Sequence, residues 1–247
     1  MSNQTKDVPP SEVLKGEPGQ PTKRKSIFRE YVEGILMIVA VALALRTLVV
    51  HAYRIPSSSM EDTLLVGDFL LANRFVYGAP VEIPFTGIVL GRLPAFSEPK
   101  YGDVLIFASW ADTTEDFIKR CVGLPGDTIL VRNNVLTVNG RLFSDILKER
   151  FGDDMSIYPK VKYSQFYRRQ IVGIDPANYG PHVVSPRHLF MMGDNRDFSS
   201  DSRFNGDVPM HRLKARAIVI YMSLDTGRGG LDLLTSIRWD RIGRLIH

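Results

Sequence analysis

The chain has 247 residues, of which 31 are Lys or Arg and 27 are Asp or Glu, so its formal charge at neutral pH is only +4. This length allows one or two domains, and the basic residues are not gathered into the patch that nucleic-acid binding requires, so no nucleic-acid partner is expected. A single cysteine excludes an intramolecular disulfide and a cysteine zinc cage, and the five histidines lack ligand spacing. No metal and no cofactor are predicted.

The N-terminal segment, residues 1–30, is predicted to be a disordered tail. Its first 25 residues are rich in Pro, Lys, Glu, Ser and Gly and almost lack large apolar side chains. Such a composition cannot bury enough apolar surface to offset the entropy of ordering the chain.

Residues 31–51 are predicted to be a single transmembrane anchor. From residue 32 to residue 50 only Glu33 and Arg46 are charged, and a helix of this length reaches about 28 Å, close to the ~30 Å hydrocarbon core. A cleaved signal peptide is the competing interpretation, but the polar segment before the span is long for one and no convincing small-x-small site follows. Six Lys or Arg residues precede the span. The positive-inside rule therefore predicts a cytoplasmic N-terminus, with the rest of the chain outside.

After the span, short β segments alternate with Gly, Pro and Asp turns. The candidate strands are residues 68–75, 103–109, 128–131, 135–138, 188–192 and 215–222. The dipeptides Asn-Asn at 133–134 and Asn-Gly at 139–140 are typical of hairpin turns. No long amphipathic helical pattern interrupts the series. The expected fold class is mostly β, an antiparallel body preceded by one transmembrane helix.

Two apolar segments have more than one interpretation. Residues 77–102 mix four prolines with apolar side chains, which fits equally a loop pinned on the core and a surface that touches the bilayer. Residues 237–246 mix arginines with apolar residues and a Trp, as an interfacial segment does. If this second segment formed a helix, its apolar and charged side chains would be only partly separated onto opposite faces. Packing against the domain is therefore favoured for it.

Two blocks together offer a nucleophile and a base. Pro-Ser-Ser-Ser-Met at 56–60 supplies serine hydroxyls, and Lys119 begins the block Lys-Arg-Cys-Val-Gly-Leu-Pro-Gly-Asp. A serine hydroxyl is a poor nucleophile until a neighbour takes its proton, and a lysine does so only where burial keeps it neutral. Ile118 and Val122 offer apolar surroundings of that kind.

A third block, Gly-Asp-Asn-Arg-Asp-Phe-Ser-Ser-Asp-Ser-Arg, occupies residues 193–203. The three blocks, in this order, resemble the type I signal peptidases, membrane-anchored serine proteases that remove signal peptides from exported proteins. The resemblance implies a catalytic β domain formed by residues 52–131 and 188–247, with a smaller β domain inserted at 132–187. It also implies that the catalytic domain lies on the outer, periplasmic side of the cytoplasmic membrane, with signal peptides of preproteins and membrane lipid as partners.

The resemblance implies a role for individual residues of these blocks. The roles are Ser59 as nucleophile, Lys119 as general base, Ser57 as a donor to the oxyanion hole, Ser199 as the group that orients the lysine, and Asp201 and Arg203 as braces. The family's preference for small residues at the cut site implies shallow apolar pockets. Their candidate lining residues are Ile55, Met60, Leu64 and Ile118.

The chain departs from the family pattern at Asp62, where a proline is usual, and at Phe198 and Ser200, where a small polar residue and an alanine are usual. Three rival interpretations of the sequence compete with the resemblance. A Ser-His-Asp hydrolase is disfavoured because the sequence has no Gly-x-Ser-x-Gly motif. A self-cleaving Ser/Lys repressor is disfavoured because it requires an upstream helix-turn-helix, where this chain has the predicted tail and span. A membrane-tethered binding module without enzymatic activity predicts that substitutions at Ser59 and Lys119 are silent.

Overall fold

The structure is a computed structural model. It describes residues 27–48, 50–74, 76–78, 80–82, 89–92, 94–111, 115–152, 175–225 and 236–247. Most of the predicted tail, and residues 153–174 of the predicted insertion, lie outside the described residues. The chain divides into two units, residues 1–41 and residues 42–247.

Helix α1 (Ile27–Leu48) occupies most of the segment predicted as an anchor. Glu30 lies in its first turn, where a carboxylate interacts favourably with the positive end of the helix dipole. Arg29 pairs with Glu33, one turn later, at 2.8 Å. Within the part of the chain whose placement is described, no helix combines the length and the apolar character needed to cross a membrane. The anchor at residues 31–51 stays a prediction.

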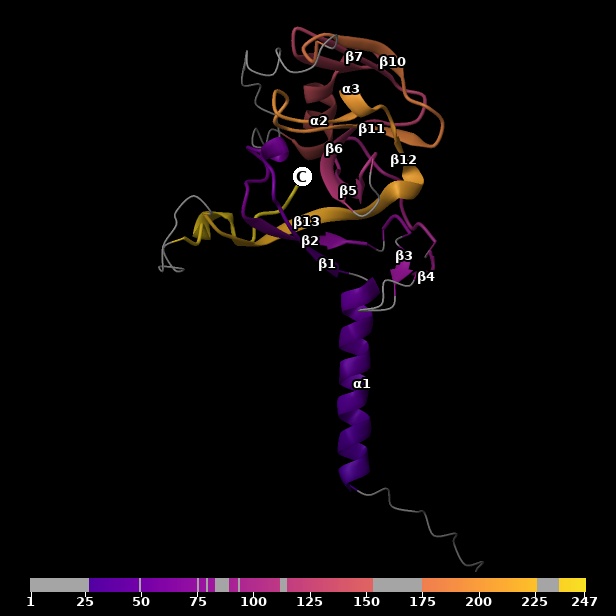
Figure 1. The fold of residues 1–247 in the computed structure, drawn as a ribbon, viewed down its shortest axis with the longest axis vertical. Coiled ribbons are helices and arrows are strands. Elements are labelled where there is room, and N and C mark those ends of the chain that lie inside the picture. Colours follow the sequence, from indigo (N-terminus) through magenta and orange to yellow (C-terminus); the bar gives the residue numbers. More distant parts are fainter. Residues whose placement is uncertain are drawn as a thin grey trace, which may run out of the picture. The chain divides into compact units, whose positions relative to one another are not determined.

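The body is built on antiparallel sheets, as the sequence predicts (Figure 1). Its largest sheet has seven strands in the described residues, and β13, which is 11 residues long, pairs with β2 and β5 on its two sides. The strands, in order across this sheet, are β1 (Val50–Arg54), β2 (Asp68–Asn73), β13 (Leu213–Ser223), β5 (Val104–Ala108), β6 (Asp116–Gly123), β11 (His188–Met192) and β12 (Val208–Pro209).

The chain between β6 and β11 forms a second sheet. Its strands, in order, are β10 (Tyr179–Val183), β7 (Thr128–Arg132), β8 (Val135–Val138) and β9 (Arg141–Leu142). Both predicted hairpin turns are confirmed, because Asn133, Asn134 and Asn139 have φ values of 48°, 65° and 51° and the strands that they join pair directly. A separate pair, β3 (Pro80–Glu82) and β4 (Val89–Arg92), lies within residues 77–102.

Helix α2 (Phe143–Phe151) lies within the predicted insertion and was not predicted from the sequence. Phe143 and Leu147 lie one turn apart and are both buried. Ile146 and Phe151 pack partly buried against the same cluster. A helix of nine residues is too short for this apolar pattern to be predicted from the sequence. Strand β6 was also not predicted, because its buried centre carries Lys119 and Arg120 where an apolar strand is expected.

The alternation of side chains along the strands divides the core. In β5, Val104 and Ile106 pack into one cluster, while Leu105 and Phe107 pack into another. A third cluster joins the two sheets and α2; its fully buried members include Val122, Ile129, Val131, Val138, Phe143, Leu147, Phe190 and Met192. Because the second sheet shares this core with the first, the division into a catalytic and an inserted domain stays a prediction.

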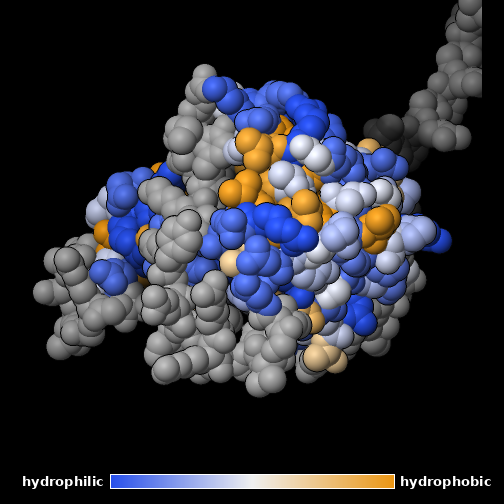
Figure 2. All heavy atoms as spheres, turned by 90° about the horizontal axis from the view of Figure 1, so that it is seen from above, coloured by the Kyte–Doolittle hydropathy of each residue, from blue (hydrophilic) through white to orange (hydrophobic). Residues whose placement is uncertain are grey.

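The two ambiguous apolar segments have different outcomes. In the C-terminal segment, Ile246 is buried in the core and Arg241, in the short 3-10 helix η5 (Trp239–Arg241), is buried in an ion pair, so packing against the body is confirmed there. In residues 77–102, Tyr77 is buried, whereas residues 83–88 lie outside the described part, so both interpretations remain open. Figure 2 shows one face of the molecule, on which hydrophilic side chains surround a group of apolar ones.

Candidate active site

The serine run lies in a tight turn that follows β1. The 3-10 helix η1 (Ser58–Met60) forms its first part, and the Leu64 amide donates to the Met60 carbonyl at 2.7 Å to close it. Met60 and Leu64 are fully buried in the core. The turn that carries Ser59 is thus fixed by apolar burial on its inner side.

Asp62 has a φ of 82° in this turn. Proline holds φ near −65° and cannot adopt this conformation. The replacement of the usual family proline by Asp62 therefore accompanies a backbone conformation that proline excludes.

Lys119 lies in the interior of the large sheet and reaches the serine. Its backbone pairs with Leu105 of β5, and its side chain is only 2% exposed. Lys119 Nζ lies 2.7 Å from Ser59 Oγ and donates to the Ile118 carbonyl at 3.0 Å. Ser59 itself is 8% exposed, so the two reactive groups meet at a nearly dry point.

Burial sets the protonation of this lysine. Loss of hydration lowers the pKa of Lys119 from 10.5 to about 8, although the carboxylates of Asp201 and Asp194 partly oppose the shift. A lysine with such a pKa is neutral in a substantial fraction of molecules near neutral and mildly alkaline pH. A neutral amine beside a serine hydroxyl can accept its proton and so activate the oxygen as a nucleophile.

Ser57 lies beside the nucleophile on the more exposed side. Its Oγ is 3.4 Å from Ser59 Oγ. Ser57 precedes η1 with extended backbone, and its side chain makes no capping hydrogen bond to that helix. The hydroxyl therefore does not cap the start of this helix, and its role as an oxyanion donor stays a prediction.

The third block brings Gly193 against the catalytic turn. A Cβ atom at this position would lie 2.2 Å from Ser199 Oγ and 2.5 Å from the Ser59 carbonyl oxygen, so no larger residue fits without displacement. Ser199 is buried, and among the described residues its Oγ has no hydrogen-bond partner of normal geometry. The hydroxyl nevertheless helps lower the pKa of the Asp201 carboxyl. The orientation of Lys119 by Ser199 stays a prediction.

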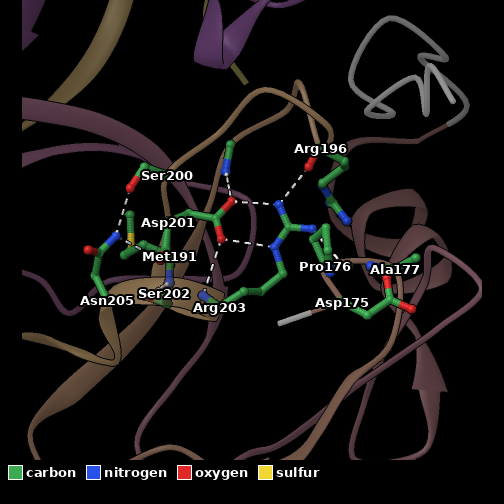
Figure 3. A network of polar contacts seen from close by, with 11 residues as sticks. Asp175, Pro176, Ala177, Met191, Arg196, Ser200, Asp201, Ser202, Arg203 and Asn205 are labelled. Atoms are coloured by element: carbon green, nitrogen blue, oxygen red, sulfur yellow. Dashed lines mark hydrogen bonds and ion pairs between the residues drawn. The ribbon is translucent and has the colours of Figure 1, made fainter. Parts of the chain in front are cut away.

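Asp201 and Arg203 form a fully buried ion pair (Figure 3). The guanidinium donates from Nε and Nη2 to the two carboxylate oxygens at 2.9 Å each, and it also donates to the carbonyls of Arg196 at 2.7 Å and Pro176 at 3.0 Å. The pair thus ties the loop of the third block to the chain entering β10. The roles of Asp201 and Arg203 as braces of the dyad stay predictions.

Asp201 also accepts from the Gly193 amide at 3.1 Å and precedes the short helix α3 (Ser202–Asn205) as its N-cap. Burial alone would raise the pKa of Asp201, but the charge and hydrogen bonds of Arg203, with the Gly193 amide, hold that pKa below its ordinary value. The carboxylate therefore stays ionised close to Lys119.

Arg120 and Asp194 were not predicted as site residues, yet they join the three blocks. Both are fully buried, and Arg120 donates to the two Asp194 carboxylate oxygens at 2.8 and 2.7 Å. The Thr63 hydroxyl donates to the same carboxylate at 2.6 Å. One carboxylate therefore connects the serine turn with the strand that carries Lys119.

Asn195 makes a second link that the sequence did not reveal. Its amide donates to the Ser59 carbonyl and its side-chain Nδ2 donates to the Ser58 carbonyl, each at 3.1 Å. The Gly-Asp-Asn-Arg motif was visible in the sequence. What the motif alone cannot show is that the Asn195 backbone amide bonds the carbonyl of Ser59 itself.

The four residues predicted to line substrate pockets lie together. Ile55, Met60 and Leu64 belong to one buried cluster, and Ile118, which is partly exposed, packs against it. Contact with substrate stays a prediction, and Ile118 has the most accessible surface for it. Among the described residues, no three His, Cys, Asp or Glu side chains are grouped as a metal site requires.

The comparisons with known proteins agree with this geometry. The family model described as "Signal peptidase, peptidase S26" matches residues 28–222, which is most of the chain. This chain belongs to the signal peptidase family. The resemblance in its three blocks is thereby confirmed, and the protein is a hydrolase of the serine-peptidase class.

Two relatives show how far the similarity extends. The signal peptidase I of Pseudomonas aeruginosa is 31% identical over 219 residues, covering 81% of this chain and 74% of that protein. The signal peptidase I of Aquifex aeolicus is 33% identical over 233 residues, covering 79% of this chain and 84% of that protein. A crystal structure of a signal peptidase I from Enterococcus faecalis aligns over 49% of this chain and 98% of that one, with a TM-score of 0.32 and 23% identity, too low a likeness to bear on the fold.

Proposed function

We propose that this member of the signal peptidase family is a membrane-anchored endopeptidase that cleaves signal peptides from exported preproteins with a Ser59–Lys119 dyad. The observation that carries the proposal is the 2.7 Å distance between Lys119 Nζ and Ser59 Oγ at a lysine that is 2% exposed. Desolvation is what allows an amine to act as a base near neutrality.

The proposed reaction passes through an acyl-enzyme. Neutral Lys119 accepts the Ser59 proton as Oγ attacks the scissile carbonyl, and the Ser59 amide and Ser57 hydroxyl stabilise the resulting oxyanion. Lys119 then returns the proton to the leaving amine. In the second half, Lys119 takes a proton from water as the water attacks the acyl carbon. Lys119 then returns this proton to Ser59 Oγ as the acyl bond breaks, which restores the serine hydroxyl.

Two strand segments near the dyad support binding of the substrate as an extended strand. β1 is an edge strand of the large sheet. β11 pairs with β6 at Arg120, Cys121 and Gly123, so the pairing begins just past the lysine. A substrate strand added against residues 53–57 and 116–119 would run past Ser59 with its main chain hydrogen-bonded.

The membrane part of the proposal depends on the sequence of the N-terminal region. The stretch between residues 32 and 50 is long enough to span the hydrocarbon core, and the six basic residues before it favour a cytoplasmic N-terminus. The catalytic body would then face preproteins as they emerge on the periplasmic side.

The experiment is cleavage of a purified preprotein by the full chain in detergent. Wild type is expected to release the signal peptide, whereas Ser59→Ala should lose at least ~10³-fold in rate because the nucleophile is gone. Ser58→Ala is the matched control, since it removes a neighbouring hydroxyl that has no assigned role, and it should keep most of the activity. Equal activity of Ser59→Ala and wild type would contradict the proposal and favour the binding-module alternative.

A further inference from the structure

The C-terminal segment, residues 236–247 and here called the C-terminal strap, lies along the outer part of β13. The Gly243 amide donates to the Ile220 carbonyl at 2.8 Å, and the Ile246 amide donates to the Ile218 carbonyl at 2.8 Å. These backbone bonds fix the strap to the large sheet. They also place η5 next to the turn that carries Ser59.

Arg241 of η5 connects the strap to that turn. Its guanidinium donates from Nε and Nη2 to the two carboxylate oxygens of Asp68, at 3.1 and 2.6 Å, and Nη2 donates also to the Thr63 carbonyl at 2.9 Å. Arg241 is 5% exposed and Asp68 is fully buried. Planar guanidinium can make all three bonds at once, because its donors point in fixed, divergent directions.

Thr63 ends the serine turn and is held from both sides. Its carbonyl accepts from Arg241, while its hydroxyl donates to Asp194, which pairs with Arg120. The Thr63 amide donates to the Met60 carbonyl, the residue directly after Ser59. Movement of Thr63 would therefore be passed to the nucleophile through one short turn.

The strap supports the reacting groups at two more points. Ile246 belongs to the same buried cluster as Met60 and Leu64, which form the inner side of the serine turn. Arg120, the neighbour of Lys119, donates from Nη1 to the His247 carbonyl at 2.6 Å. The strap thus contacts both the turn of the nucleophile and the strand of the base.

We infer that Arg241 is a positioning residue of the peptidase reaction, which holds the Ser59 turn at bonding distance from Lys119 through the Thr63 carbonyl. This inference rests on the proposed function of the dyad. The guanidinium of Arg241 bonds Asp68 and Thr63, so its inferred role is to set the geometry of the turn and not to bind substrate. A displacement of about 1 Å between reacting groups can cost on the order of 10²-fold in rate.

The test compares Arg241→Lys with Arg244→Lys in the full chain in detergent, using a soluble signal-peptide substrate. Lysine keeps the charge beside Asp68 but cannot make the three divergent hydrogen bonds. We expect kcat to fall by roughly 10–100-fold with KM changed by less than about twofold. Arg244 is an exposed arginine of the same strap, and its replacement should leave both constants unchanged.

A second measurement separates this inference from the proposed function. Backbone hydrogen exchange of residues 58–64 does not depend on cleavage, and it should become faster in Arg241→Lys than in wild type and Arg244→Lys. If wild type cleaves no signal peptide, the proposed function fails, while the exchange result still decides whether Arg241 holds the turn. Unchanged exchange in this turn, or wild-type kcat in Arg241→Lys, would overturn the inference.

If Arg241→Lys does not fold, the double variant Arg241→Gln with Asp68→Asn replaces it. This pair leaves no unpaired buried charge and still removes the guanidinium bond to the Thr63 carbonyl. The same loss of kcat and the same faster exchange are expected. A folded double variant with wild-type kcat and exchange would overturn the inference.

Discussion

At the scale of single residues, the proposed chemistry depends on a lysine that the fold keeps almost out of water. The same burial that would normally exclude a lysine from a strand interior is what lowers its pKa to about 8. Ile118 and Val122 predicted an apolar environment for this residue from the sequence. The register that points its amine at Ser59 was not visible there, because it depends on strands and turns far apart in the chain.

Lys119→Arg tests the base directly. Guanidinium keeps the positive charge but does not lose its proton near neutral pH, so peptide cleavage should fall to background. In wild type, kcat/KM should rise with pH through about 8, since only the neutral amine accepts the serine proton. Rates measured from pH 6 to 10 check both expectations, and substantial cleavage by Lys119→Arg would remove the lysine from the mechanism.

The depressed pKa of Lys119 also predicts a pH dependence of stability. The unfolded chain binds this proton up to pH 10.5 and the folded chain only up to about 8, so the penalty for burying the charge is full below pH 8 and disappears as pH rises to 10.5. The unfolding free energy of wild type relative to Lys119→Met should therefore rise by about 3 kcal/mol across this window. Denaturant unfolding of both proteins at pH 7 and 10.5 measures it, and a constant difference would contradict the lowered pKa.

At the scale of elements, the site is assembled by buried charged groups that connect the serine turn, β6 and the loop after β11. Arg120 and Asp194 form the central pair, and Thr63 attaches the serine turn to it. Replacing one member leaves the other buried without its partner, which is far more costly than the pair itself is stabilising.

Asp194→Asn is expected to lower the unfolding free energy by about 3–5 kcal/mol, because Arg120 would keep its charge without a counter-ion. Asp145 in α2 is exposed, and Asp145→Asn serves as the matched control with an expected change near zero. Thermal or denaturant unfolding of the full chain compares the two variants. Equal stability of both would mean that the Arg120–Asp194 pair does not hold the elements together.

Several strands lie close to their predicted bounds. β8 and β11 have the predicted bounds, β7 is longer by one residue, and β13 is longer by two residues at its start and one at its end. In β7 and β8, burial alternates along the strand and Asn turns follow each strand, so these two are defined locally. β6 was missed because its charged residues are neutralised by partners distant in sequence, such as Asp194. Ser59 and Lys119 lie in short sequence blocks and were found from those blocks. The roles of Arg120, Asn195 and Arg241 depend on contacts with residues distant in the sequence, so only the folded structure reveals them.

At the scale of the whole molecule, the body contains the nucleophile, the base and the bracing loop without residues 1–49. Deleting these residues leaves β1 (Val50–Arg54) and its pairing with β2 intact. A detergent-solubilised short peptide should then be cleaved at close to the full-length rate. A bilayer-inserted preprotein should be cleaved more slowly, because an anchor confines enzyme and substrate to one surface and raises their effective concentration.

The comparison of both substrates with both proteins checks this division of roles. Loss of peptide cleavage by a truncated protein that is still folded would show that the N-terminal region is part of the active site. Equal cleavage of the bilayer-inserted preprotein by both forms would show that residues 1–49 do not contribute to substrate encounter.

The most direct test of the Ser59–Lys119 dyad is an NMR titration of the lysine side chains in the full chain, with Lys119→Arg used to assign the signal. One lysine signal, absent from the variant, should titrate at about 8, below the ordinary lysine value of 10.5. Titration of Lys119 at or above 10.5 would mean that the amine stays charged at working pH, and it would contradict its role as the base that activates Ser59.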